Sequence, residues 1–244
     1  MADVRYEVRG PAAWVTFDRP EAHNAMTFEM YEQLHAFCER ADAEEDVRVL
    51  VLRGAGDKAF VAGTDIRQFL DFSSGEDGLR YEATIDRIVG RLETVGKPTI
   101  ALVDGYAMGS GLALSAACDL RICTPAAVFG LPIARTVGNC LSMENYARLA
   151  ALLGEARVKD IVFTARRVSS EEALSWGLAT EVVDDAEARV AELCEQLAGH
   201  APTTLWATKE ALRRLRPVPA GDDLVREVYG SDEFRARVRA FLER

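Results

Sequence analysis

Residues 103–111 have the sequence Val-Asp-Gly-Tyr-Ala-Met-Gly-Ser-Gly, and this stretch decides the fold class. It follows an apolar run, Thr99 to Val103, that predicts a buried strand. It precedes a run of small residues, Leu112 to Cys118, that predicts a helix. Glycines between a strand and a helix indicate a tight turn whose backbone N–H groups are left unpaired at a helix N-terminus. We therefore expect an α/β protein.

A second glycine-containing turn, Lys58 to Ile66, has similar surroundings. It follows the buried-strand pattern Val49 to Leu52 and leads into a predicted short helix, Asp65 to Phe69. If the two turns meet in space, two N–H groups can converge on one oxygen, which suits a thioester carbonyl turning into an enolate or a tetrahedral oxyanion. The residues alone leave open that both turns are ordinary strand-to-helix connections, because glycine turns are common.

Strand and helix patterns alternate through the first half of the chain. A β-hairpin is predicted over residues 4–9 and 13–17, and Thr27 can cap a helix whose apolar face includes Met30, Tyr31, Leu34, Phe37, Cys38 and Ala41. A further helix is predicted over residues 79–95 and a strand over residues 120–123. This order predicts right-handed crossovers between strands of one α/β domain.

Helical patterns dominate after Ser142. The predicted helices cover residues 143–153, 156–163, 170–176, 186–197, 203–215 and 232–242. Pro217 to Gly221 predicts a flexible joint. We expect a core over residues 1–198 and a C-terminal helical region over residues 199–244 that packs on the core or on a neighbouring subunit.

Composition excludes several classes of function. The 244 residues carry a net charge of −10 with acidic and basic residues interleaved, which disfavours general nucleic-acid binding. No apolar run approaches the ~20 residues of a membrane helix. The five cysteines form no CxxC pair and have no histidine at metal spacing, so we expect reduced thiols and no metal site. The N-terminal residues do not resemble a secretory leader, so we expect a cytoplasmic protein.

Segments spread over nearly the whole chain match one known family in order and spacing. They are Arg19 to Met26, Ala59 to Ile66, Lys97 to Gly111, Cys118 to Arg121, Ser169 to Leu178, Thr208 to Leu212 and Asp232 to Leu242. In these segments the chain resembles the crotonase (enoyl-CoA hydratase/isomerase) superfamily. The resemblance implies a spiral of ββα units and a C-terminal helical oligomerisation region that builds homotrimers or dimers of trimers.

The resemblance also implies a site for an acyl-CoA thioester, with coenzyme A as part of the substrate and no permanently bound cofactor. The oxyanion donors would be the backbone N–H groups of Thr64 and Ser110. The remaining coenzyme A contacts would come from Ala25 and Met26 beside the pantetheine arm, from Ala62, Asp65, Ile66 and Arg67 along the adenine and pantetheine, and from Arg19 or His23 at a phosphate. A solvated loop position is the alternative for Arg19 and His23.

The chain departs from the hydratase pattern at two positions. A hydratase of this family uses one Glu two residues after the glycine-containing turn that corresponds to residues 103–111, and another directly after a Pro. Here these positions hold Ala113 and Ile133, the latter after Pro132. Neither side chain can move a proton, so the chain is an atypical member for which standard hydration is not expected. An apolar pocket favours a double-bond shift by a remote base or a decarboxylation.

Candidates for a replacement group are few. One of Asn139, Cys140 and Leu141 occupies the place where, by the resemblance, dehalogenase and dienoyl-isomerase relatives carry an Asp. Cys140 is either a nucleophile or a small buried thiol. Arg135 binds either a substrate carboxylate or a structural partner. Glu82 and Asp86 lie one helical turn apart on the helix that, by the resemblance, often covers family active sites. They are the nearest candidates for a spare acid pair, but a solvated helix face is favoured for them.

Three functions remain open from the sequence. The first is an enzyme of the hydratase/isomerase type, a lyase or an isomerase, that stabilises a thioester enolate. The second is a non-catalytic acyl-CoA-binding subunit. The third is a thioester hydrolase that uses Cys140 or an activated water.

Overall fold

Two β-sheets form the centre of the molecule in the computed structural model, which describes residues 3–243. The first sheet has the strand order β1-β2-β3-β5-β7-β10, and only the β1–β2 hairpin in it is antiparallel. Its strands are β1 (Val4–Arg9), β2 (Ala12–Phe17), β3 (Val49–Gly54), β5 (Thr99–Val103), β7 (Leu120–Cys123) and β10 (Glu181–Val182). The predicted hairpin and the three predicted buried strands are therefore confirmed.

The second sheet is small and lies beside the first. It has the order β4-β6-β8-β9, with β4, β6 and β8 parallel and β9 antiparallel to β8. Its strands are β4 (Ala59–Val61), β6 (Tyr106–Met108), β8 (Val128–Gly130) and β9 (Arg167–Ser169). The sequence did not predict this sheet, because strands of three residues are too short to show an alternating pattern.

Each repeat of the fold adds one strand to each sheet and then one helix. The successive repeats are β3-β4-α2, β5-β6-α3 and β7-β8-α4, where α2 is Gly75–Glu93, α3 is Ser110–Ala117 and α4 is Met143–Leu153. This ββα spiral confirms the predicted fold class. The spiral also places the ends of β4, β6 and β8 beside one another.

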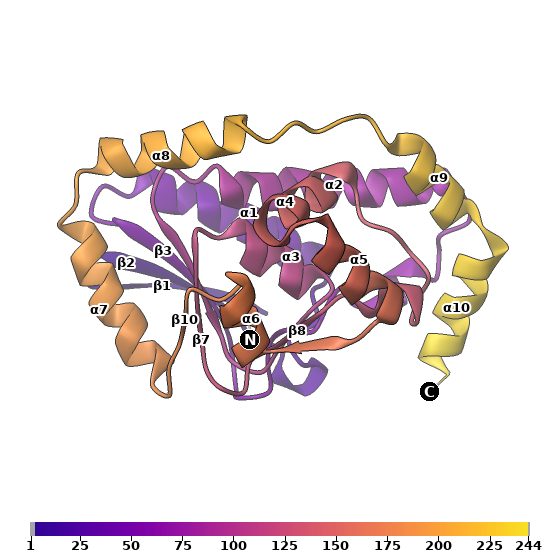
Figure 1. The fold of residues 1–244 in the computed structure, drawn as a ribbon, viewed down its shortest axis with the longest axis horizontal. Helices are drawn as coiled ribbons and strands as arrows, with labels where there is room; N and C mark the ends of the chain where they lie inside the picture. Colours follow the sequence, from indigo (N-terminus) through magenta and orange to yellow (C-terminus); the bar gives the residue numbers. More distant parts are fainter. Residues whose placement is uncertain (1–2, 244) are drawn as a thin grey trace.

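Helices lie around the two sheets (Figure 1). Helix α1 (Phe28–Ala43) begins where predicted, because the Thr27 side chain accepts a hydrogen bond from the Met30 N–H. Helix α2 begins four residues earlier than predicted, because the Asp77 carboxylate accepts hydrogen bonds from the N–H groups of Ser73 and Ser74. Among the described residues, no helix is both long and apolar enough to cross a membrane.

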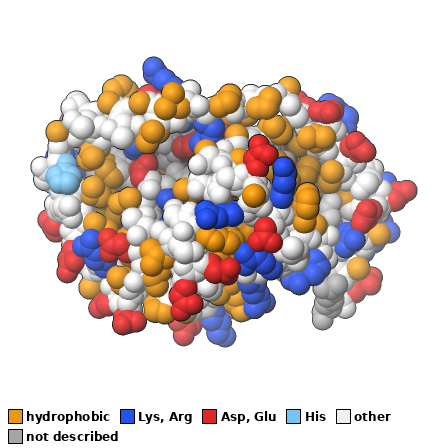
Figure 2. Space-filling model, in the orientation of Figure 1, with side chains coloured by type: hydrophobic (Ala, Val, Ile, Leu, Met, Phe, Trp, Pro, Cys, Tyr) orange, Lys and Arg blue, Asp and Glu red, His pale blue; other side chains and the backbone are white. Residues whose placement is uncertain are grey.

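The remaining helices follow α4 along the chain. They are α5 (Glu155–Thr164), α6 (Ser170–Trp176), α7 (Ala186–Ala198), α8 (Pro202–Arg214), α9 (Asp222–Gly230) and α10 (Asp232–Leu242). Figure 1 shows α7 and α8 at the end of the molecule opposite to α9 and α10. Helix α8 buries no residue in this chain. In Figure 2 hydrophobic side chains lie among polar ones along the upper edge, where Figure 1 places α8 and the segment that follows it.

Helix α9, which the sequence did not predict, crosses α2 at very short range. A Cβ atom on Gly78 would lie 2.3 Å from the Tyr229 side chain, and one on Gly75 would lie 2.1 Å from the Arg226 carbonyl oxygen. The two glycines thus allow the helices to touch. Helix α10 follows and contacts the short 3-10 helix η2 (Ile66–Phe69) through the buried Phe234. The two C-terminal helices therefore cover the end of the molecule where the second glycine-containing turn lies.

Candidate active site

A cavity of about 490 Å³ lies where the second sheet meets α2, α3 and α10. Its walls come from the turns after β4 and β6, from α2, from the segment 132–141 and from the end of α10. The lining includes most residues predicted for the site: His23, Ala25, Ala62, Thr64, Asp65, Ile66, Arg67, Ser110, Ala113, Pro132, Ile133 and Asn139. The fold thus brings into one cavity residues that lie more than a hundred positions apart in the sequence.

The two glycine-containing turns lie side by side at one wall of this cavity. Strands β4 and β6 are parallel neighbours, and each ends just before a turn. Gly63 has a φ of +121° and Gly109 a φ of +56°, which L side chains rarely adopt. A Cβ atom on Gly109 would lie only 3.5 Å from Gly63 Cα, so the two turns approach each other closely.

In these turns the backbone N–H groups of Thr64 and Ser110 are unpaired among the described residues. Between Met26 and Thr64 the chain forms a bridge in which the Met26 N–H donates to Gly63 and the Asp65 N–H donates to Met26. This bridge leaves the Thr64 N–H unused. Ser110 is the first residue of α3, so its N–H has no partner inside the helix. Within the part of the chain that the structure describes, neither N–H has a hydrogen-bond partner.

Hydroxyl groups surround the Thr64 side chain. Thr64 Oγ1 lies 2.8 Å from the Tyr31 hydroxyl and 2.8 Å from the Tyr81 hydroxyl. Burial raises the pKa of Tyr31 to about 12, so the phenol is neutral at physiological pH. The Ser110 Oγ is also buried, and it has no partner among the described residues. This wall of the cavity is therefore polar but uncharged.

The opposite part of the cavity is apolar where a hydratase of the family would have its carboxylates. Ala113 and Ile133 are buried and line the cavity, next to Pro132 and Val137. Two polar side chains of the segment 132–141 line the cavity: Thr136, whose Oγ1 donates to the Pro132 carbonyl oxygen at 2.9 Å, and Asn139, whose Nδ2 donates to the Tyr229 hydroxyl at 3.1 Å. Proton transfer at this site therefore needs a group from another element.

Met26 and Arg19, which were predicted to contact coenzyme A, do not line the cavity in the described residues. Met26 is fully buried in the main core and is not part of the cavity lining in the described residues. Arg19 is mostly buried beneath the loop, where it donates to the Ala25 carbonyl oxygen at 2.7 Å and lies 3.4 Å from the Asp65 carboxylate. Arg19 thus holds together the two loops that line the cavity mouth.

Arg135 and Cys140 also lie outside the cavity lining in the described part of the chain. Arg135 is exposed, so its guanidinium faces solvent. Cys140 is half-buried, and burial raises the pKa of its thiol to about 12. A thiol with such a pKa is almost entirely protonated at neutral pH and is a weak nucleophile. We therefore exclude Arg135 and Cys140 from the candidate active site.

The prediction of a solvated face for Glu82 is wrong. Glu82 is only 4% exposed and lines the cavity, and burial raises its pKa to about 8. Asp86, one turn later, is half-buried, and burial raises its pKa to about 6. The sequence did indicate that Glu82 is buried, because Glu82 stands three residues before Ile85 and therefore lies on the same helix face as the predicted apolar stripe.

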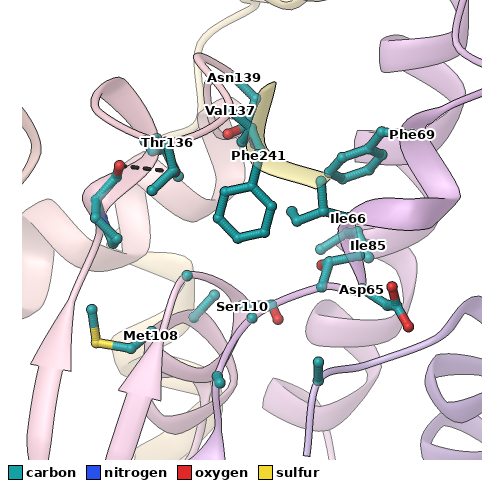
Figure 3. A pocket seen from close by; sticks show the side chains of 18 of the residues that line it. Asp65, Ile66, Phe69, Ile85, Met108, Ser110, Thr136, Val137, Asn139 and Phe241 are labelled. Atoms are coloured by element: carbon teal, nitrogen blue, oxygen red, sulfur yellow. Dashed lines mark hydrogen bonds between the residues drawn. The ribbon is translucent and has the colours of Figure 1, made fainter. Parts of the chain in front are cut away.

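Helix α10 supplies a further part of the wall that the sequence did not reveal. Phe241 and Leu242 line the cavity. Figure 3 shows the Phe241 ring pointing into the cavity that Ser110, Ile66 and Thr136 also line. The C-terminal helix of the chain therefore narrows its own cavity.

Comparison with known proteins supports the family resemblance. Residues 8–234 match the model of the family described as enoyl-CoA hydratase/isomerase. A short-chain-enoyl-CoA hydratase from Clostridium acetobutylicum is 32% identical over 216 residues, which cover 88% of this chain and 82% of the relative. A carnitinyl-CoA dehydratase from Salmonella enteritidis is 35% identical over 220 residues, which cover 86% and 80% of the two chains.

The fold comparison agrees with the sequence comparison. The crystal structure of an enoyl-CoA hydratase/isomerase from Xanthobacter autotrophicus Py2 superposes with a TM-score of 0.89 at 25% identity. The superposition covers 99% of this chain and 96% of that chain. Sequence and fold therefore point to the same family over nearly the full length of the protein.

Proposed function

Because the chain belongs to the enoyl-CoA hydratase/isomerase family, we propose that it is an enzyme that binds an acyl-CoA thioester and stabilises its enolate. The thioester carbonyl oxygen accepts hydrogen bonds from the N–H groups of Thr64 and Ser110. The observation that supports this proposal is the close approach of the two turns, since Thr64 and Ser110, whose N–H groups are unpaired among the described residues, line the same cavity.

The two donors act on the charge that develops during the reaction. As a proton or a carboxyl group leaves the carbon next to the carbonyl, negative charge collects on the carbonyl oxygen. Fixed N–H donors in a site that excludes water stabilise this charge, and each is worth about 3 kcal/mol of barrier. Helix α3 adds partial positive charge at its N-terminus, where Ser110 lies.

The mouth of the cavity suits the coenzyme A part of the substrate. His23, Ala25 and Ala62 line it on one side, with Asp65, Ile66 and Arg67 next to them. Arg67 is largely exposed and donates to the Asp65 carboxylate through Nε and Nη2, which leaves its Nη1 group to donate to a phosphate. In this proposal coenzyme A is bound only as part of the substrate.

The reaction is a double-bond shift or a decarboxylation rather than standard hydration. Hydration needs carboxylates that hold and deprotonate a water, and Ala113 and Ile133 supply none. A decarboxylation is favoured in an apolar cavity, because the substrate carboxylate loses its stabilising water there. The named relatives are hydratases and a dehydratase, so this chain would differ from them in its reaction.

A panel of acyl-CoA thioesters followed by mass spectrometry tests the proposal. The panel contains crotonyl-CoA, 3-butenoyl-CoA and methylmalonyl-CoA, and the products of water addition, double-bond shift, carbon dioxide loss and hydrolysis are separated. We expect isomer or carbon dioxide. Rapid hydration of crotonyl-CoA would contradict the interpretation of Ala113 and Ile133.

Two other functions make different predictions in the same assay. A non-catalytic acyl-CoA-binding subunit would bind the panel and leave it unchanged. A thioester hydrolase would release free acid, but the raised pKa of Cys140 and its position outside the lining disfavour the thiol as its nucleophile. We also propose a homotrimer or a dimer of trimers, supported by the exposure of Trp206 and Leu212 on α8, which buries no residue in this chain.

A further inference from the structure

Glu82 enters the cavity from the wall that adjoins the two glycine-containing turns. Its neighbours on the same helix face, Tyr81 and Ile85, also line the cavity. The Tyr81 hydroxyl lies 2.8 Å from Thr64 Oγ1, so this part of α2 touches the residue that carries one of the two free N–H groups. A carboxyl group at this position can reach a substrate whose carbonyl oxygen is bound at the turns.

Glu82 lacks the partners that a structural carboxylate has on the same helix. Glu93 lies 2.9 Å from the Arg148 guanidinium and 2.7 Å from the Arg216 guanidinium, which makes its charge tolerable inside the protein. Glu82 is less exposed than Glu93, yet no lysine or arginine among the described residues pairs with it. An unpaired buried carboxyl group is costly, and such groups cluster at functional sites.

Hydrogen bonds hold the Glu82 side chain in one orientation. Its Oε1 accepts from the Tyr229 hydroxyl at 2.6 Å, and its Oε2 accepts from the Ser142 N–H at 2.9 Å. The Asn139 amide donates to the Tyr229 hydroxyl, and Glu82 Oε1 is the nearer of the two acceptors of that hydroxyl, at 2.6 Å compared with 3.4 Å for the Cys140 carbonyl oxygen. A carboxylate oxygen has two lone pairs, so both oxygens keep acceptor capacity.

We propose that Glu82 is the acid/base group that moves the proton at the acyl carbon next to the thioester carbonyl. The inference rests on the proposed function, because it assumes that the carbonyl oxygen lies at Thr64 and Ser110. Tyr229 and Asn139 are positioning residues that orient the carboxyl group. The group thus comes from α2, whereas the resemblance would have placed carboxylates at positions 113 and 133.

The proposed proton transfer needs only the substrate and the Glu82 carboxylate. The C–H bond next to the carbonyl breaks, its electron pair moves to the carbonyl oxygen as an enolate, and the proton binds the Glu82 carboxylate. Return of the proton to the same carbon regenerates the substrate. In an acyl chain with a double bond between the third and fourth carbons, delivery of the proton to the fourth carbon shifts the double bond into conjugation.

The surroundings of Glu82 set the pH range in which it can act. Burial raises its pKa to about 8, whereas the hydrogen bond from Tyr229 lowers it, so both protonation states are accessible near neutral pH. The titratable groups that face Glu82 are Tyr31 of α1, Tyr81 and Asp86 of α2, Cys140, Tyr146 of α4 and Tyr229 of α9. Burial raises the pKa values of these neighbours as well, so at neutral pH the tyrosines and the thiol stay uncharged.

Exchange of the α-hydrogens of acyl-CoA probes in deuterium oxide tests the role of Glu82. The probes are butyryl-CoA, 3-butenoyl-CoA and phenylacetyl-CoA, and deuterium uptake is followed by mass spectrometry. We expect E82Q to bind the probes with unchanged affinity and to lose exchange by about 10²-fold or more. The control is D86N, because Asp86 lies one turn away on the same helix and, among the described residues, outside the cavity lining. The charge of Asp86 helps to raise the pKa of Glu82, so D86N should keep exchange at high pH, with the rising limb of its pH profile shifted to lower pH.

The outcomes separate the two proposals. If E82Q exchanges as fast as the wild type, Glu82 is not the base, and the proposed function stands. If the wild type takes up no deuterium from any probe, the enolate proposal fails and the role of Glu82 fails with it. Loss of exchange in D86N equal to that in E82Q would assign both effects to disturbance of α2 and would also overturn the role of Glu82.

The Y229F variant tests the role of Glu82 through the pH dependence of exchange, which would not shift if Glu82 had only a structural role. In Y229F the hydrogen bond that lowers the pKa of Glu82 is absent, so the rising limb of the exchange-pH profile should shift to higher pH. If the exchange rate of the wild type does not rise near pH 8, Glu82 is not the acid/base group. The same conclusion follows if the rise occurs at the same pH in Y229F as in the wild type.

Discussion

Gly111 lies so close to Val61 that a Cβ atom on it would meet the Val61 carbonyl oxygen at 2.0 Å. This contact seats the start of α3 on the end of β4, and it brings the Ser110 N–H to the turn that contains Thr64. The distance between the two donors therefore depends on the absence of a side chain at one position.

The first prediction concerns this close approach. G111A should force α3 away from β4, lower the free energy of unfolding by more than about 1 kcal/mol and reduce turnover, because core overpacking costs roughly that much. The control is G90A, since nothing lies within 4 Å of a Cβ atom on Gly90 in helix α2. That variant should gain about 0.5 kcal/mol. Chemical denaturation measures both, and a neutral G111A would contradict the described packing.

The second prediction follows from the raised pKa of Glu82. Burial raises this pKa from 4.5 to about 8, so the native state holds the proton more tightly than the unfolded state between these pH values. The stability of the wild type relative to E82Q should therefore fall as the pH rises from about 5 to about 8. Urea unfolding of both proteins at several pH values measures the difference. A difference that does not change with pH would mean that Glu82 is already ionised at low pH.

The third prediction concerns Glu93, whose contribution to stability should change with pH in the opposite direction to that of Glu82. Although burial opposes ionisation, hydrogen bonds from Arg216 and Arg148 lower the pKa of Glu93 from 4.5 to about 2. E93Q should lose roughly 3 kcal/mol at neutral pH, because the buried Arg148 then lacks a charged partner. This loss should shrink as the pH falls from about 4.5 to about 2. Equal stability of E93Q and the wild type at neutral pH would contradict the prediction.

The fourth prediction concerns the shape of the cavity. The Phe241 ring points into the cavity from α10 (Figure 3) and remains partly exposed. F241A should enlarge the space for the acyl chain and raise kcat/KM for longer acyl-CoA thioesters relative to short ones, with little change in thermal stability. The ratio of kcat/KM values over a chain-length series measures this. A ratio that stays constant would place the acyl chain elsewhere.

Much of the fold could be predicted from the sequence, because long apolar patterns dominate local structure. The strand Thr99–Val103 and the helix Met143–Leu153 have the predicted bounds, since a buried run and a helical stripe are unambiguous at these lengths. The second sheet could not be predicted. Its strands are stabilised by pairing with partners far away in the sequence, and each is only three residues long.

The site was predictable where it depends on backbone turns and less so where it depends on side chains. Gly63 and Gly109 mark the turns, because few other residues adopt their φ values. Glu82 was considered as part of an acid pair but was assigned to a solvated face because of its polarity, whereas the chain folds α9 and α4 over it and supplies the Tyr229 and Ser142 hydrogen bonds. Burial by elements that follow in the sequence is not visible in a local pattern.

The comparison of S110P with S110A tests the central claim most directly. Ser110 is the first residue of α3, where proline is tolerated, so S110P removes the N–H at small structural cost. S110A keeps the N–H and removes a hydroxyl group that has no partner among the described residues. For the most reactive acyl-CoA thioester of the panel, we expect kcat to fall by about 10²- to 10³-fold in S110P and to change little in S110A. Wild-type kcat in a correctly folded S110P would contradict the two-donor site.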